Sequence, residues 1–275
     1  MVDFAWACAV GIRFTGIVEF ILSGAGLLAV GLLWRSFRRI EKFGEAVGNF
    51  GLWMCLVGAI VVFSYLCAHL SLPLLDSRFV AADRALGFDW LAWNSFVEAH
   101  PSFKIVLAIA YGSLSWQLMA VCFIAPFSHD RGRASEFLWI TLLTAISACL
   151  ISGVLPAEGA LPFFNVGKAV WIDDLHTLRN GGPMTFEISH SQGIVTFPSF
   201  HAALCLIFSW SFRRMRFFGG AAIGLNLMML ISTPTKGGHY LVDVIAGLVL
   251  ALVAILVVRR CRNTGALEQP DADGG

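Results

Sequence analysis

Long apolar stretches alternate with short polar connectors along most of the chain. A helix that crosses a bilayer needs about 20 predominantly apolar residues. Seven stretches approach this length, at about 14–34, 50–73, 104–126, 137–155, 197–212, 217–232 and 239–258. The pattern predicts an all-α, polytopic membrane bundle of about seven transmembrane helices, or six if the first stretch lies in the membrane interface.

Two connectors are long enough to hold structure of their own. In 74–103, apolar residues recur at intervals of three and four, which predicts an amphipathic helix at the membrane surface. The connector 156–196 mixes Pro, Gly, Trp and charged residues without a clear period, and loops of this length usually form a lid or part of a site. The polar, Gly-rich tail at 263–275 is expected to be disordered.

Composition supports a membrane protein, since 57% of the residues are hydrophobic, 13% are charged and the mean hydropathy is +0.76. A net charge of +1 provides no concentrated basic face, so we expect no nucleic-acid partner. Twelve of the nineteen Lys and Arg residues lie in alternate connectors, those containing "RSFRRIEK", "HDRGR", "RRMR" and "RRCR". The positive-inside rule places these connectors and the C-terminus in the cytoplasm, and the N-terminus outside.

The stretch "TFPSFHAALCLIF" places polar residues where a helix enters apolar surroundings. Pro198 suits the first turn of a helix, because its missing N–H is not needed there. The free N–H groups of a helix start form an anion site, to which Ser199 adds a hydroxyl and His201 an ionisable donor. Taken alone, a structural histidine at a helix end is the commoner case.

A second polar element, "STPTKGGHYLVDVIAG", precedes the last apolar stretch. His239 and Asp243 are four residues apart, so on a helix their side chains share one face. The carboxylate can then fix the imidazole tautomer and leave the other ring nitrogen free as a nucleophile. Gly237 and Gly238 allow a close backbone approach to a ligand. An ordinary reversal between spans explains the glycines but not an aspartate one turn into an apolar helix.

Topology brings these two elements together. From His201 the chain crosses the membrane, turns at "RRMR" and crosses back to reach His239, so both histidines are expected at the outer face. Together they supply a nucleophile, an orienting carboxylate in Asp243, a second histidine that can protonate a leaving oxygen, and helix-end donors for a phosphate. This combination favours an active site over two structural histidines.

The two elements resemble motifs of the type 2 phosphatidic acid phosphatase and vanadium haloperoxidase superfamily. "PSFH" is similar to its second motif, usually PSGH, and "STPTKGGHYLVD" to its third, usually SR, five residues, H, three residues, D. The resemblance implies a metal-independent phosphoryl transfer, without a cofactor, through a phosphohistidine on His239. Asp243 would orient His239, His201 would act as general acid and Ser199 would bind phosphate. The implied domains are an N-terminal helix and connector at 1–49 and a six-helix phosphatase-like catalytic domain at 50–262.

Three departures from the family pattern affect the expected reaction. Phe200 replaces the usual Gly, Thr233 replaces the usual phosphate-binding Arg, and the first motif, K, six residues, RP, is missing. These features resemble the inositol phosphorylceramide synthase branch, which transfers a phosphoinositol head group between lipids. We therefore expect a lipid phosphatase or phosphotransferase, with inositolphosphotransferase-type transfer as the alternative.

Another cation should then neutralise the phosphate. Arg179 is favoured, because the adjacent Asn-Gly-Gly would let the loop fold over the site and its planar fork suits phosphate oxygens; Lys236 and Lys168 are further candidates. We expect no metal. A solvated loop arginine is the competing interpretation of Arg179.

The expected partners are a lipid phosphate substrate and membrane lipids, with the oligomeric state left open. The expected location is a bacterial inner membrane, with the site facing the periplasm or exterior. A lipid transporter without chemistry is the alternative from another class, although transporters usually place polar sites near the bilayer midplane. A haloperoxidase is a third alternative, which the apolar spans disfavour.

Overall fold

The computed structural model describes residues 7, 9–37, 40–127, 132–167, 169–181, 184–188, 191, 193–213, 215 and 219–264. The candidate Lys168 and most of the expected disordered tail, from residue 265 onward, lie outside the described residues.

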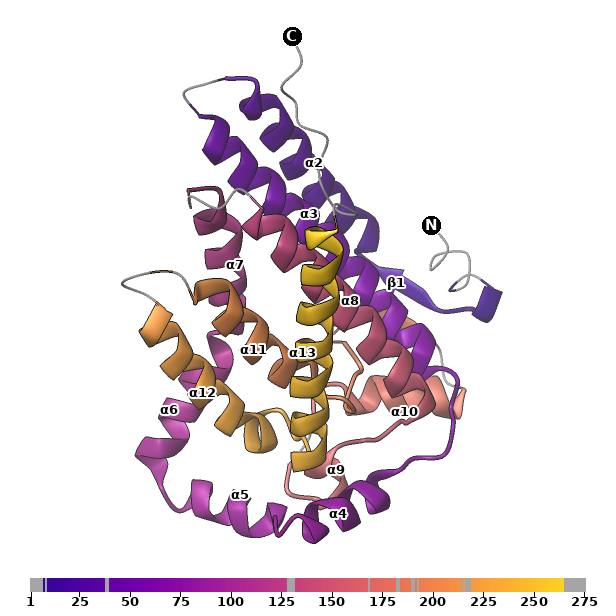
Figure 1. The fold of residues 1–275 in the computed structure, drawn as a ribbon. Coiled ribbons are helices and arrows are strands. Elements are labelled where there is room, and N and C mark those ends of the chain that lie inside the picture. The colour runs from indigo at the N-terminus through magenta and orange to yellow at the C-terminus, as the bar shows by residue number, and fades with distance from the viewer. Residues whose placement is uncertain are drawn as a thin grey trace.

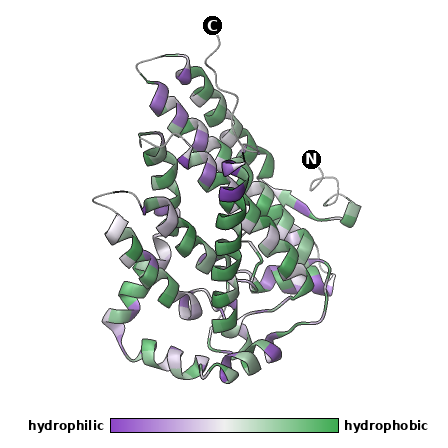
Figure 2. Ribbon diagram, in the orientation of Figure 1, coloured by the Kyte–Doolittle hydropathy of each residue, from purple (hydrophilic) through white to green (hydrophobic). Residues whose placement is uncertain are grey.

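Long apolar helices form most of the molecule, and the predicted all-α membrane bundle is confirmed (Figures 1 and 2). Five helical stretches within the described residues are long and apolar enough to cross a membrane. They are α2 (Ile17–Arg35), α3 (Glu41–Ala68), the run formed by α6 (Pro101–Gly112), α7 (Leu114–Ile124) and η1 (Ala125–Phe127), α8 (Arg133–Val154) and α13 (Leu241–Asn263).

The two shortest expected spans are also helical. They form α11 (Phe200–Phe212) and α12 (Gly219–Lys236). The 13 residues of α11 are fewer than the roughly 20 that a simple crossing needs. All seven apolar stretches are therefore found as helices, while seven crossings stay a prediction.

The connector 74–103 was expected to form one amphipathic helix, but the structure divides it into two. These are α4 (Asp76–Ala85) and α5 (Trp90–Glu98), which lie across one end of the bundle (Figure 1). The break includes Gly87, whose φ of +79° lies in the left-handed region that glycine adopts readily. Asp76 and Asp83 of α4 are only 4% and 2% exposed, so this helix turns carboxylates inward.

The connector 156–196 contains regular elements that its sequence did not predict. It includes α9 (Ala160–Phe163), α10 (Ile172–Asn180) and the strand β2 (Thr185–Glu187). β2 pairs in parallel with β1 (Arg13–Thr15), with Phe14 opposite Phe186. This small sheet ties the N-terminal part of the chain to the connector.

Two arrangements of helices build the core. The main apolar cluster joins α3, α7, α8, α11, α12 and α13, with Phe137, Ile207 and Phe208 fully buried. α2 packs on α3 through glycines; a Cβ on Gly31 would lie 2.4 Å from the backbone nitrogen of Gly48. α4, α5 and α9 lie at one end of the bundle, and the last turn of α13 points towards the other (Figure 1).

Candidate functional site

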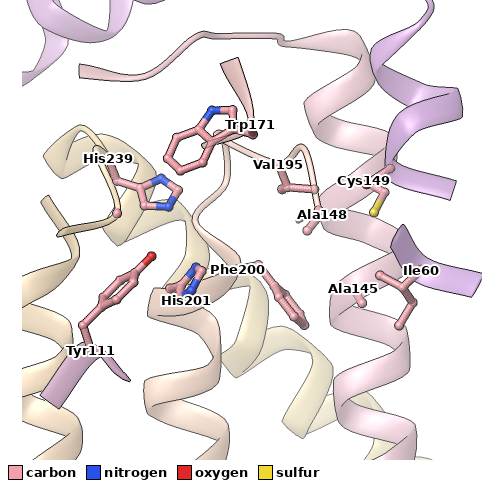
Figure 3. Close-up of a pocket in the computed structure, with 13 residues that line it drawn as sticks. Ile60, Tyr111, Ala145, Ala148, Cys149, Trp171, Val195, Phe200, His201 and His239 are labelled. Atoms are coloured by element: carbon pink, nitrogen blue, oxygen red, sulfur yellow. The ribbon is translucent and has the colours of Figure 1, made fainter. Parts of the chain in front are cut away.

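A small pocket of about 120 Å³ lies near the ends of α3 and α8, between these helices, α6 and the start of α11. Both predicted histidines line it, together with Tyr111, Trp171 and Phe200 (Figure 3). Apolar side chains of α3 and α8 form the opposite wall (Figure 3). The pocket thus places two imidazoles in a mainly apolar chamber.

His201 lies in the first turn of α11. The helix begins at Phe200, and Ser199 is its N-cap, with Oγ accepting from Ala202 N at 3.3 Å. Pro198 therefore precedes the helix instead of occupying its first turn as expected, because Ser199 supplies the cap. The His201 ring stacks on Tyr111, with centroids 4.6 Å apart and an interplanar angle of 13°. This stacking fixes the imidazole plane beside the pocket.

His239 lies in the connector between α12 and α13, and its ring centroid is 6.2 Å from that of His201. His239 Nδ1 lies 3.4 Å from Asp243 Oδ2, and both side chains are almost fully buried. Within the described residues Nδ1 forms no hydrogen bond. Asp243 Oδ2 accepts from Tyr240 N at 2.9 Å as part of the capping box of α13. The helix start therefore holds the carboxylate beside the imidazole.

The second and third motifs are joined through backbone contacts. Ser199 N donates to Asp243 O at 2.9 Å. A Cβ on Gly247 would lie only 2.1 Å from Ser199 O, so glycine is required for this approach of α13 to α11. Ser199 is fully buried and does not line the pocket, so in this structure its hydroxyl is a helix cap, and phosphate binding by it stays a prediction.

The glycine pair before His239 makes room for the site. A Cβ on Gly237 would lie 2.8 Å from His239 Cδ2 and 3.0 Å from the Tyr111 hydroxyl oxygen. Gly238 adopts a φ of +65°, and its carbonyl accepts from Ala160 N at 2.7 Å. The glycines thus permit the turn and dock it on the connector 156–196.

Two aspartates of α4 support the third motif, and sequence reasoning missed them. Asp83 accepts from Leu241 N and Val242 N, both at 2.9 Å, and so caps α13 from another helix. Asp76 Oδ1 accepts from the Tyr240 hydroxyl at 2.8 Å and from Gly159 N at 2.9 Å. Their spacing of seven residues, which puts two carboxylates on one helical face, was the available signal.

Burial shifts the pKa values of the groups around the connector between α12 and α13. It lowers the pKa of His239 to about 4, and a backbone hydrogen bond with Thr196 opposes the shift in part. Burial raises the pKa of Asp83, against the two backbone N–H groups that it accepts from. It also raises the pKa of Tyr240, together with the nearby carboxylate of Asp76. His239 is therefore neutral at pH 7 and carries a lone pair on one ring nitrogen.

The predicted phosphate-binding cations do not line the pocket. Arg179 lies in α10, and its Nη2 donates to Leu72 O at 2.9 Å. Lys236 is the last residue of α12. Thr233, where the family usually has Arg, is buried and donates to Met229 O at 2.9 Å. The described residues that line the pocket include no Lys or Arg, and the described part of the chain holds no cluster of His, Cys, Asp or Glu able to bind a metal.

Comparison with protein families gives one match. A model of the PAP2 superfamily matches residues 77–257. The chain belongs to the PAP2 superfamily, that of the type 2 phosphatidic acid phosphatases. Comparisons with curated proteins and with solved structures gave no significant match.

The PAP2 match covers the part of the chain that carries both histidines and Asp243. It extends from α4, with Asp83, through most of α13, with His239 and Asp243. α2 and the whole of α3 lie before it. With its long apolar helices, this PAP2 protein is a membrane enzyme of the phosphatase type.

Proposed function

We propose that the protein is an integral-membrane phosphatase or phosphotransferase that acts on a phosphate ester of a lipid at the outer membrane face. The observation that carries the proposal is the meeting of two histidines from separate motifs in one pocket, with ring centroids 6.2 Å apart. A phosphorus atom between the rings would be within reach of both. A neutral His239 beside a buried carboxylate has the features of an oriented nucleophile.

The proposed reaction has two steps. In the first, the free nitrogen of His239 attacks phosphorus; an N–P bond forms, the P–O bond to the leaving group breaks, and His201 gives a proton to the leaving oxygen. Asp243 stabilises the positive charge that develops on the His239 ring. In the second, His201 takes a proton from water or an acceptor hydroxyl, whose oxygen attacks phosphorus and releases His239. Water gives a phosphatase, and a lipid alcohol gives a transferase.

Binding of the phosphate group is assigned in this proposal to Ser199, Arg179 and Lys236. Arg179 would have to exchange its contact with Leu72 O for the phosphate, which the glycines after α10 make feasible. Its Nη1 is buried without a partner among the described residues, so one donor of the fork is already unsatisfied. An incoming phosphate would satisfy that donor.

Transfer of a phospho-head group between lipids, as in the inositol phosphorylceramide synthase branch, is the second candidate. Phe200, at the position of the usual glycine, contributes an aromatic side chain to the pocket. Thr233, at the position of the usual arginine, has its hydroxyl bonded to the backbone of its own helix. A pocket with fewer charges and more apolar surface favours a lipid acceptor over water.

The test is turnover of purified protein in detergent with a panel of lipid phosphates and phosphoinositides, with a chelator present. Both free phosphate and new phospholipids are measured. His239→Ala should abolish both, whereas His100→Ala, which changes an exposed histidine on the connector between α5 and α6, should keep them. Free phosphate identifies a phosphatase, and a new phospholipid without it identifies a transferase. Neither product from any donor contradicts the proposal and favours lipid transport, which a vesicle assay would then measure.

A further inference from the structure

A second, larger cavity lies on the same two helices that form the wall of the histidine pocket. It measures about 450 Å³ and is bounded by α2, by the first half of α3 and by the first half of α8. The histidine pocket contacts the later parts of α3 and α8, at Ser64 and Cys149. From Asn49 in the cavity to Ser64 is about 22 Å along α3, at 1.5 Å per residue. We call this cavity the α2–α8 groove.

The three helices that line the groove share one change of side-chain polarity along their length. Each changes from leucine to polar side chains in the same direction, towards the end of the bundle away from the histidines. The leucines and the polar residues recur at intervals of three and four, so on each helix they form one stripe. The stripes are Leu28, Leu32 and Arg35 on α2, Leu56, Leu52, Asn49 and Glu45 on α3, and Leu142, Leu138 and Ser135 on α8.

At the end of the groove away from the histidines, three polar side chains have unpaired groups among the described residues. Within the described residues the side chains of Arg35 and Glu45 form no hydrogen bond and no ion pair, although they carry opposite charges. Asn49 Nδ2, one turn deeper, is buried without a hydrogen-bond acceptor. A buried donor left unpaired costs roughly 1–3 kcal/mol, so an acceptor in the groove would be favoured there. Trp139 stands at the rim, 46% exposed, as tryptophan commonly does at head-group depth.

We propose that the α2–α8 groove binds one phospholipid with a phosphoethanolamine head group. The acyl chains lie along the leucines, and an ester carbonyl accepts from Asn49 Nδ2. The phosphate pairs with Arg35 and the ammonium group donates to Glu45. An anionic lipid without an amine offers Glu45 no cationic partner, and the methylated amine of choline has no N–H group to donate. Opposite charges at one end of an apolar groove therefore select a zwitterionic head group with a free ammonium.

The first test fills the groove and counts bound lipid. Leu32 lines the groove and Leu33, its neighbour, faces away; they are 55% and 61% exposed, so neither change disturbs the core. Native mass spectrometry in detergent with added phosphatidylethanolamine should show one tightly bound lipid on the parent protein and on Leu33→Trp. Leu32→Trp should weaken this binding at least tenfold. Equal binding by the two variants would overturn the proposal.

The second test exchanges the head-group charges. In competition, the parent protein should prefer phosphatidylethanolamine over phosphatidylglycerol and phosphatidylcholine. Glu45→Gln should reverse the preference towards phosphatidylglycerol, since an anionic head group no longer meets a carboxylate, while Arg35→Gln should weaken both lipids. A parent protein that retains phosphatidylglycerol as tightly as phosphatidylethanolamine, or a Glu45→Gln variant with unchanged preference, contradicts the assignment.

Discussion

Two different cavities lie at the two ends of the α3–α8 pair, a closed pocket at one and an open groove at the other. At one end, the start of α11, the third-motif connector and part of 156–196 close a histidine pocket of about 120 Å³. At the other end α2 packs mainly on α3, and a groove of about 450 Å³ remains beside α8. Among the described residues, the groove has no cross-links of the kind that hold the pocket, where Ser199 N donates to the backbone oxygen of Asp243, and Leu241 N and Val242 N donate to the Asp83 carboxylate. The histidine pocket is thus fixed by hydrogen bonds between segments that are distant in the chain. The α2–α8 groove stays open because it has no such bonds among the described residues.

Of the changes that test this comparison, Asp243→Asn in the histidine pocket is expected to have the largest effect, on kcat. The change keeps shape but removes the charge beside His239, so kcat should fall by about 10⁴-fold, as for other oriented histidines that lose their carboxylate. KM should change little, because Asp243 does not line the pocket. Steady-state kinetics with the substrate found in the panel measures both. Unchanged kcat, or a loss seen only in KM, contradicts the orienting role.

Asp83→Ala should have the next largest effect, on the free energy of unfolding. It leaves the N–H groups of Leu241 and Val242 without acceptors, and each unpaired buried group costs roughly 1–3 kcal/mol. Asp89→Ala is the matched control, since that aspartate caps α5 at an exposed position and its loss costs about 1 kcal/mol. Thermal unfolding in detergent compares the two. A loss no greater for Asp83 than for Asp89 contradicts the cross-link.

A change of pH near neutrality should alter kcat/KM and stability less than the two substitutions do. Because the pKa of His239 is lowered to about 4, the lone pair stays available well below the usual range. The acid limb of kcat/KM that belongs to His239 should therefore lie near pH 4, with activity falling as pH drops through that value. An unfolded chain, with a histidine pKa near 6.5, binds the proton first, so the free energy of unfolding falls as pH drops from about 6.5 to 4.

This experiment needs a check on folding. Protein returned from each pH to pH 7 should recover full activity, which separates titration from unfolding. An acid limb centred near 6.5 with full recovery would show that burial does not hold His239 neutral.

The smallest effect on turnover is expected from a substitution in the α2–α8 groove. Leu32→Trp should change turnover less than twofold, because Leu32 lies on α2, which does not line the histidine pocket. The same assay applied to Leu33→Trp gives the baseline for a tryptophan at the lipid face. A loss of turnover for Leu32→Trp alone would show that the two ends of the pair are coupled.

The helices could be predicted because each apolar stretch is a local signal. All seven stretches are helical, although α11, the helix of the second motif, begins at Phe200, after Pro198. The connector 156–196 could not be predicted, since β2 is fixed by pairing with β1, which lies more than 170 residues earlier in the chain. Such pairing leaves no periodic pattern in either segment.

The site was predictable to the extent that motif spacing and topology specify it. His201 and His239 were placed together by counting crossings, and they line one pocket in the structure. Tyr111 was missed because an aromatic residue in an apolar stretch has no distinguishing signal. Asp83 was missed for another reason: its partners lie 158 and 159 residues away, and only folding brings them near.

The cap that Asp83 provides also has a consequence for biosynthesis. α4 is made early, but the N–H groups it accepts from belong to α13, which follows every other element of the pocket in the chain. Since chains emerge from the ribosome N-terminus first, Asp83 has no partner until α13 has been inserted. His239, the proposed nucleophile, and Asp243 arrive in the same step. On the proposed mechanism, the newly made protein is therefore inert throughout translation, and its activity begins only when α13 has been inserted.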